Sequence, residues 1–421
     1  RFGPHRLHQF FHRLGLMSAL DEARTYLKEQ NLEEKITEAI SQVVREKAPD
    51  AVARVAQILQ AKTGKMPCPP TVDYIQTVGN TPMVNLKKIL PADCKAKRVL
   101  AKLEMQNPGG SLKDRIALSM IEAAEARKEI TPGTTTLVDF TSGNTGIGEA
   151  MVAAAKGYKC IIVMPQVPPM YERYMICRMF GAEVHLLNPV AGATAWLKYT
   201  EELGQKPNHW YINQMANMDN PDAHIQATGP EILAQVPDID YFVHGIGTGG
   251  CIQGVGTFLK SKKPDCKVVA LEPSEARVHT GAPMSKHGIV GWMPGFHSKF
   301  IEGAKWSEEG KALDDKPRGV VDEWGHVSTP EGVAMAKELA SKEGMMVGPS
   351  SGAAIKYALD LACRAEAKDK TIVVVVPSHG IRYGAHPLWA GLKEEVGKAL
   401  PAGAITTDKE APVCQWNSSQ S

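Results

Sequence analysis

From Val78 onward, short apolar runs alternate with amphipathic stretches, and this alternation constrains the fold more than any other feature. The apolar runs have the length and composition of strands buried on both faces of a sheet. The stretches between them repeat their apolar residues at helical spacing. This order predicts an α/β fold with a mostly parallel sheet. The expected strands are Leu137–Phe140, Cys160–Met164, Tyr241–His244, Val268–Leu271 and Ile372–Val376, and the expected helices are Lys113–Lys128, Thr145–Lys156 and Ala334–Lys342.

Three loops rich in small residues, at 107–115, 141–146 and 245–250, each follow a predicted strand and precede a predicted helix. Loops at the carboxyl ends of strands bind ligands in open α/β sheets, and N–H groups at a helix start attract anions. The third loop has four glycines and predicts a phosphate site. It lacks P-loop spacing. Its loose G-x-G-x-x-G, with Glu272 lying 22 residues after Gly250, leaves a dinucleotide site open.

The composition of the 421 residues argues against several classes of function. A net charge of +2 gives no field that would favour nucleic acid or a membrane surface. No apolar run reaches the roughly 20 residues of a membrane span. The eight cysteines are scattered without a CxxC pair, which argues against a metal site and a disulfide framework. We expect a basic segment at 1–20, a helical hairpin at 21–62, a linker at 63–72, two α/β domains at 73–218 and 219–400, and a flexible tail at 401–421.

A series of motifs between about residues 75 and 395 resembles the cysteine synthase and cystathionine β-synthase family, in the family's order. The resemblance implies a two-domain, parallel-sheet architecture of the tryptophan-synthase-β type (fold type II) and pyridoxal 5′-phosphate as the cofactor. It also implies that 73–218 is the N-terminal catalytic domain, with a mobile part at about 160–204, and that 219–400 is the C-terminal catalytic domain. The motifs are Gly79-Asn80-Thr81-Pro82-Met83-Val84, Ser111-Leu112-Lys113-Asp114-Arg115, Thr141-Ser142-Gly143-Asn144-Thr145-Gly146, Asn213-Gln214 with Thr228-Gly229-Pro230-Glu231, Gly247-Thr248-Gly249-Gly250, Gly348-Pro349-Ser350-Ser351-Gly352 and Pro377-Ser378.

The resemblance also implies a role for each site residue. Lys113 resembles the lysine that holds the cofactor as a Schiff base and moves the α-proton, and Asn144 resembles the residue that binds the cofactor's phenolic oxygen. Ser378 resembles the residue that faces the pyridine nitrogen, where a neutral serine favours β-elimination and replacement over transamination. The implied phosphate loop is Gly247, Thr248, Gly249, Gly250 and Cys251, and the implied substrate site is Thr141, Ser142, Asn144, Thr145, Gln214 and Gly291.

The residues themselves are compatible with two interpretations of these positions. A lysine at a helix start inside a closed cleft has a lowered pKa, as this chemistry needs. Lys113 is alternatively an exposed lysine paired with Asp114 or Glu104. The loop at 141–146 is alternatively an ordinary helix N-cap. The combination of motifs favours the catalytic interpretation.

Three positions depart from the family pattern. Cys251 stands where the family usually has threonine, and a thiol is the poorer hydrogen-bond donor. Trp292, followed by Pro294, adds bulk near the expected entrance. Ile381 stands where cysteine synthases usually have glutamate. These departures affect the expected substrate more than the Schiff-base chemistry.

The resemblance implies a cysteine synthase that replaces the acetate of O-acetylserine with sulfide through an aminoacrylate, as a homodimer and with serine acetyltransferase as a further partner. The alternatives are cystathionine β-synthase-like or β-cyanoalanine synthase-like replacement, a dehydratase of the same fold, or a weakly active relative tethered to a scaffold.

Residues 21–62 resemble the dimerisation-and-docking domain of protein kinase A regulatory subunits, which implies capture of an amphipathic partner helix. An N-terminal arm that packs within the dimer is the alternative. We expect a cytoplasmic location. A ciliary axoneme is the alternative if this segment docks a scaffold, and an organelle is the alternative if 1–20 is a transit-peptide remnant.

Overall fold

The computed structural model describes residues 73–141, 143–167, 170–281, 285–292, 297–301 and 319–399, together with 37, 40, 404, 405, 414 and 415. Our interpretations of segments 1–20, 21–62 and 63–72 therefore lie outside the described residues. In the segment 401–421, Ala404–Ile405 (β11) pairs antiparallel with Cys414–Gln415 (β12). We expected only a flexible tail in this segment.

The larger sheet has six strands in the order β1-β2-β10-β7-β8-β9. The first, β1, pairs antiparallel with β2, and all other neighbours are parallel. The sheet joins distant parts of the chain, because β2 lies directly beside β10. The strands are β1 (Met83–Asn85), β2 (Arg98–Lys102), β7 (Tyr241–Gly245), β8 (Lys267–Pro273), β9 (Glu323–Val327) and β10 (Thr371–Val375).

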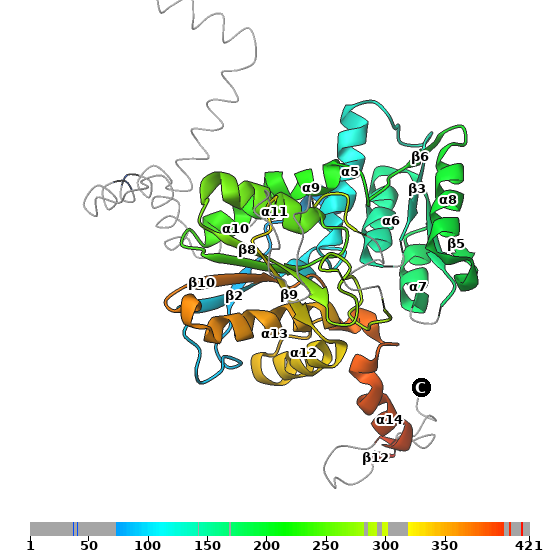
Figure 1. The fold of residues 1–421 in the computed structure, drawn as a ribbon. Helices are drawn as coiled ribbons and strands as arrows, with labels where there is room; N and C mark the ends of the chain where they lie inside the picture. Colours follow the sequence, from blue (N-terminus) through cyan, green and yellow to red (C-terminus); the bar gives the residue numbers. More distant parts are fainter. Residues whose placement is uncertain are drawn as a thin grey trace, which may run out of the picture. The chain divides into compact units, whose positions relative to one another are not determined.

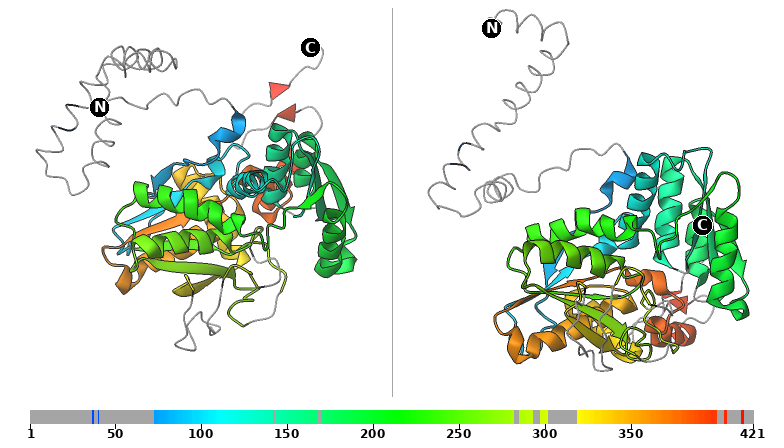
Figure 2. Two further views of the ribbon diagram at one scale, coloured as in Figure 1. Left: turned by 90° about the horizontal axis from the view of Figure 1, so that it is seen from above. Right: turned by 45° about the horizontal axis from the view of Figure 1, so that its top comes forward.

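The smaller sheet has four parallel strands in the order β5-β4-β3-β6. The two views in Figure 2 show it with its helices as a lobe beside the larger sheet. Its strands are β3 (Thr136–Phe140), β4 (Lys159–Pro165), β5 (Glu183–Leu187) and β6 (His209–Tyr211). Because β1 and β2 join the larger sheet, the segment that we placed in an N-terminal domain at 73–218 supplies strands to both sheets.

Helices cover both faces of each sheet (Figure 1). On the larger sheet, α10 and α11 lie on one face, and α12 and α13 lie on the other. On the smaller sheet, α8 packs on one side and α6 on the other. The helices are α5 (Lys113–Ala126), α6 (Asn144–Lys156), α7 (Tyr171–Met179), α8 (Gly192–Gly204), α9 (Asp219–Ala223), α10 (Gly229–Gln235), α11 (Gly250–Lys262), α12 (Thr329–Glu343), α13 (Pro349–Cys363) and α14 (Ala390–Ala399).

The apolar runs form the centre of this α/β fold, as their pattern predicts. All five residues of β10 are buried. The next two strands of the sheet, β7 and then β8, are buried except at their first residues. Each strand and helix that we predicted between 113 and 376 coincides with an observed element, and the ends differ by at most two residues except at α12, which begins five residues early. That helix starts at a capping box, in which Ser328 and Glu331 bind each other's backbone N–H groups.

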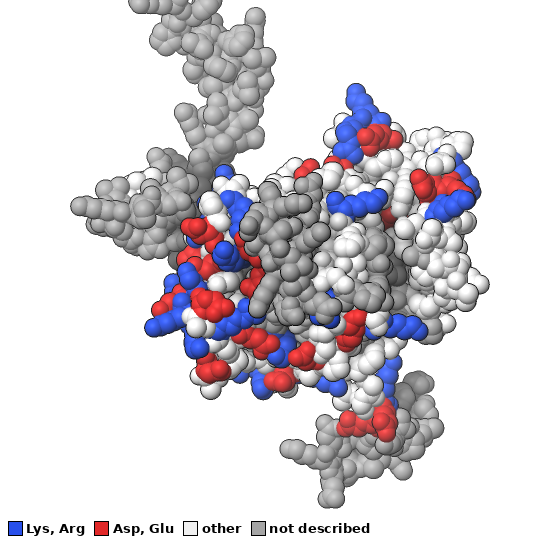
Figure 3. Space-filling view, viewed as in Figure 1, with Lys and Arg blue, Asp and Glu red and all other residues white. Residues whose placement is uncertain are grey.

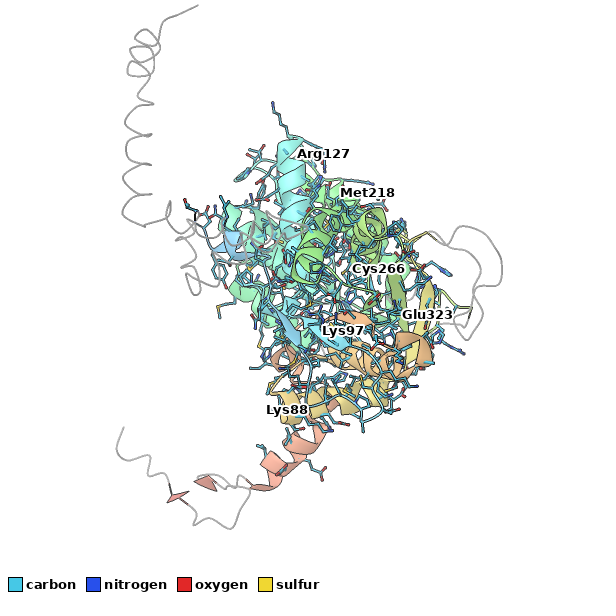
Figure 4. The ribbon with its side chains drawn as sticks, turned by 90° about the vertical axis from the view of Figure 1, so that its left-hand side faces the viewer. Lys88, Lys97, Arg127, Met218, Cys266 and Glu323 are labelled. Atoms are coloured by element: carbon cyan, nitrogen blue, oxygen red, sulfur yellow. The ribbon has the colours of Figure 1, made fainter. Side chains whose placement is uncertain are left out.

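Surface charge is mixed in sign on the face shown in Figure 3, in keeping with the small net charge. Arg127, which Figure 4 labels at the end of α5, lies on the surface. It binds Asp219 at the start of α9 with an N–O distance of 2.8 Å. No helix of the described residues is long and apolar enough to cross a membrane. The same residues contain no group of three or more side chains suited to holding a metal ion.

Candidate active site

Lys113 is the first residue of α5, and its side chain borders two adjoining cavities. It is only partly buried by surface area, because it faces these cavities, yet the surrounding protein desolvates its amine. This desolvation lowers the pKa of Lys113. Asp114 and Glu104, the partners in the alternative interpretation, make no salt bridge with it. The amine of Lys113 is therefore desolvated and has no acidic partner among the described residues.

The loop that ends at α6 lies on one side of this amine. Asn144 and Thr145 are the first two residues of α6, and the N-cap residue, Gly143, has no side chain with which to cap the helix start. The hydroxyl of Thr145 donates to Oε1 of Gln214 at 2.7 Å. The larger cavity, of about 320 Å³, is lined by Thr141, Asn144, Thr145 and Gln214 as well as by Lys113. Ser142 lies outside the described residues.

The glycine loop lies opposite, between β7 and α11. Gly247 and Thr248 line the larger cavity, and a β-carbon at Gly247 would lie 3.9 Å from the Lys113 amine. Gly249 has φ +92°, a left-handed conformation that favours glycine. The backbone N–H of Gly250 donates to the Thr248 hydroxyl at 3.3 Å. Cys251 is buried behind the loop and lines neither cavity, and burial raises the pKa of its thiol to about 12.

Ser378 follows β10 and lines the smaller cavity together with Lys113, Asn144 and Gly291. Its hydroxyl is 2.7 Å from that of Tyr383. Asn144 donates from Nδ2 to the Tyr383 hydroxyl at 3.2 Å and accepts at Oδ1 from Arg382 at 3.1 Å. Tyr383 and Arg382 therefore orient Asn144, and our sequence interpretation did not assign this role to them.

This arrangement is an amine beside an uncapped helix start, with a glycine cradle and a neutral hydroxyl around the adjoining cavity. The model of the family described as "Pyridoxal-phosphate dependent enzyme" matches residues 74–378. The chain belongs to this family.

Cysteine synthases and related solved structures resemble the chain over most of its length. A cysteine synthase of Staphylococcus aureus is 39% identical over 323 residues, which are 76% of this chain and 98% of the relative. A crystal structure of O-acetyl serine sulfhydrylase isoform 3 from Entamoeba histolytica has a TM-score of 0.68 at 34% identity and covers 77% of this chain and 93% of its own. An O-ureido-L-serine synthase structure has a TM-score of 0.70 at 34% identity, with 77% and 96% covered.

The residues of this pyridoxal-phosphate dependent enzyme fit its cofactor. Lys113 offers an amine that no described acid engages, and its lowered pKa favours the neutral form that imine chemistry requires. The glycine loop offers backbone N–H groups at the start of α11, where a phosphate is favoured. Ser378 offers an uncharged hydroxyl, and Asn144 a side-chain amide, on the same cavity. Lys113, Asn144, Ser378 and residues 247–250 would hold the cofactor.

The structure changes the interpretation of two departures from the family pattern. Trp292, which we expected near the entrance, is only 5% exposed and lies in the wall of both cavities. It packs against Gly245 so closely that a β-carbon there would overlap its indole. Ile381 is 70% exposed on the surface and lines neither cavity. Of these two positions, Trp292 is the one that shapes the cavities.

His244 is a cavity residue that the sequence interpretation treated only as the end of a buried strand. It is 5% exposed, it lines the smaller cavity with Lys113 and Ser378, and its Nδ1 has no hydrogen-bond partner among the described residues. Burial, and secondarily the charge of Lys113, lowers the pKa of His244 to about 3, so its imidazole is neutral at working pH. Its position one residue before the glycine loop was the only signal in the sequence.

We expect His244→Ala to weaken cofactor binding roughly three- to tenfold, because the cavity loses a polar wall that a ligand can satisfy. The dissociation constant would be measured by titrating apoenzyme with pyridoxal phosphate and following the visible band. The effect should be the same from pH 6 to 9, since the imidazole is neutral throughout. His209→Ala, on β6 and away from both cavities, is the control. An unchanged dissociation constant for pyridoxal phosphate in His244→Ala would show that His244 does not contribute to cofactor binding.

Proposed function

We propose that the chain is a cysteine synthase that replaces the acetate of O-acetylserine with sulfide. The observation that carries this proposal is the unpartnered Lys113 amine, which shares one cavity with an uncapped helix start and adjoins a neutral Ser378. The resemblance to cysteine synthases over 76% of the chain supports the choice of reaction.

Each group has a defined task in this proposal. The bound cofactor supplies the electron sink that stabilises negative charge at Cα. The Lys113 amine takes the α-proton from the substrate and later returns it. The free N–H groups at the start of α6 bind the substrate carboxylate. Ser378 would face the bound cofactor without a charge, and a neutral partner there would moderate the electron sink and favour loss of a β-substituent.

The cavity favours sulfide over homocysteine as the nucleophile. Homocysteine would bring a second carboxylate into the site. Among the described residues that line the larger cavity, Lys113 and His287 are the basic ones. Lys113 would bind the cofactor, so only His287 could pair with the second carboxylate. The remaining wall is largely apolar and includes Phe140 and Trp196, whose rings stack with centroids 5.8 Å apart. A small nucleophile without a carboxylate of its own therefore suits this site better than a second amino acid.

Absorption spectroscopy with product analysis tests this proposal. The purified protein should show the visible band of a lysine-bound cofactor, and O-acetylserine should shift this band. Adding sulfide should restore it and yield cysteine. Parallel reactions with cyanide and homocysteine should give lower kcat/KM. A protein that binds the cofactor but forms no cysteine, or that prefers cyanide or homocysteine, would reject the cysteine synthase assignment.

We further propose a homodimer. Tyr171, Met175 and Met179 form a stripe on α7 at helical spacing, and they are 54%, 59% and 86% exposed. Exposed apolar stripes of this kind commonly mark a protein interface.

We also propose that residues 160–204 move to close the site and that the tail of a serine acetyltransferase docks in it. Light scattering on the full chain, alone and with acetyltransferase, would test both associations.

A further inference from the structure

Two carboxyl groups are buried beneath the substrate site, and the proposed reaction does not use them. Asp139 on β3 is 1% exposed and Glu149 on α6 is fully buried. Each carboxyl group shifts the pKa of the other at hydrogen-bonding range. Neither of them takes part in a salt bridge with any described residue. The facing groups are the thiols of Cys160 on β4 and Cys177 on α7 and the phenol of Tyr211 on β6, each with a pKa raised by burial.

The oxygen atoms of this pair require a proton. Oδ2 of Asp139 accepts from Nε2 of Gln214 at 3.1 Å. Oδ1 of Asp139 and both oxygens of Glu149 have no donor among the described residues. Two ionised carboxylates can only accept, so a proton on one oxygen of Glu149 is the donor that Oδ1 of Asp139 lacks. Burial raises the pKa of both groups, that of Asp139 to about 7 and that of Glu149 well above its usual value. Each partner's effect lowers the pKa of Asp139 and raises that of Glu149, so Glu149 holds the proton.

The pair is connected to the substrate site through Gln214. The two N–H groups of this amide are used by Oδ2 of Asp139 and by the backbone oxygen of Phe140, each at 3.1 Å. The amide oxygen must then face Thr145, whose hydroxyl donates to it at 2.7 Å. If the amide turned over, an N–H group would face Thr145 and an oxygen would face the carboxylate. Asp139 thus sets the orientation of Gln214 and, through Thr145, the first turn of α6.

We propose that Glu149 and Asp139 are positioning residues that hold Gln214 and the first turn of α6 in the geometry that binds the substrate carboxylate. This inference rests on the proposed function, because the carboxylate site belongs to it. Protonated Glu149 donates to Asp139, and Asp139 fixes Gln214. Loss of the shared proton at alkaline pH places two like charges in a dry interior and releases Gln214. Amino-acid binding then weakens, whereas cofactor attachment to Lys113 persists.

The test compares the dissociation constant for L-serine in Glu149→Gln, Glu149→Leu and the wild-type enzyme between pH 6 and 10. Binding would be measured from the shift of the visible band, which needs no turnover. Glutamine keeps a donor at every pH, so Glu149→Gln should bind as the wild type does at pH 7 and should lack the alkaline weakening. Leucine removes the donor, so Glu149→Leu should bind roughly three- to tenfold more weakly at pH 7. The titrating amino group of serine affects all three proteins alike.

Thermal unfolding gives a second measurement. The pKa of Glu149 is raised by folding, so its contribution to stability is lost as pH rises toward that pKa. Glu149→Gln should therefore have a melting temperature that falls less between pH 7 and 10 than that of the wild type. An alkaline weakening of binding that is equal in wild type and Glu149→Gln would overturn the proposal, even if Glu149→Leu fails to fold. If no amino acid shifts the band of the wild type while the cofactor binds, the proposed function fails instead, and the inference with it.

Discussion

Replacing Lys113 with alanine should remove the visible band of the lysine-bound cofactor and lower kcat by roughly 10³-fold or more. The variant loses both the covalent attachment and the amine that takes and returns the α-proton. Lys113 has no acidic partner among the described residues, so its removal leaves no unpaired buried charge. The fold should therefore persist, and the glycine loop should still bind the cofactor reversibly. Absorbance, steady-state kinetics and the melting temperature would measure these three effects.

Borohydride reduction separates covalent from reversible attachment in the same variant. Reduction should fix the cofactor to Lys113 in the wild type, and mass spectrometry of the α5 peptide would locate it. Lys198→Ala, whose side chain is 76% exposed on α8, is the matched control and should keep both the band and the activity. Covalent labelling of the alanine variant to the wild-type extent would show that another lysine carries the cofactor, and the site assignment would be wrong.

The sequence predicts the scaffold well because its strands are buried on both faces. In β10, for example, Thr371–Val375 is flanked by parallel partners on each side, so its burial dictates a continuous apolar run. The loops at 141–146 and 245–250 could be predicted in the same way, since a helix start beside a strand end needs small residues. Both the strands and the loops are determined by residues that are consecutive in the sequence. The family resemblance adds the cofactor, which no periodicity indicates.

The parts that could not be predicted depend on contacts between distant residues. Tyr383 binds Ser378 and Asn144, and Asn144 lies 239 positions away. Asp139 and Glu149 looked like an ordinary strand residue and an ordinary helix residue, and nothing in their spacing indicates that both are buried face to face. Trp292 looked like added bulk near an entrance, although it packs on Gly245. In each case the contacting residue is brought close only by the tertiary fold, so no local pattern in the sequence indicates it.

The same holds for Arg115, which belongs to the lysine motif but binds no part of the candidate site. It is 4% exposed. Its guanidinium makes hydrogen bonds of 2.6 and 2.9 Å with Glu104 and of 2.8 and 2.7 Å with Glu231. Lys102, fully buried on β2, binds Glu231 from the other side at 2.7 Å. This network ties β2, α5 and α10 together, and Arg115 lies only two residues from Lys113.

We expect Arg115→Met to lower the free energy of unfolding by about 3–5 kcal/mol, because it leaves the buried carboxylate of Glu104 without its cation. Although burial opposes it, Arg115 lowers the pKa of Glu231 to about 2. This depressed pKa means that Glu231 stabilises the wild type above its unfolded pKa, and that the stabilisation is lost as pH falls toward 2. The deficit of Arg115→Met should therefore be larger at pH 8 than at pH 4. Urea unfolding at both pH values would measure it.

Arg127→Met is the matched control, because Arg127 follows the same helix and also binds two acids, Glu129 and Asp219. Its side chain is 44% exposed, so solvent screens the pair and the expected loss is about 0–1 kcal/mol. Equal losses in the two variants would mean that the Arg115 network contributes no more than a surface ion pair. A loss confined to Arg115→Met, accompanied by weaker cofactor binding, would instead show that this network holds the start of α5, and with it Lys113, against the larger sheet.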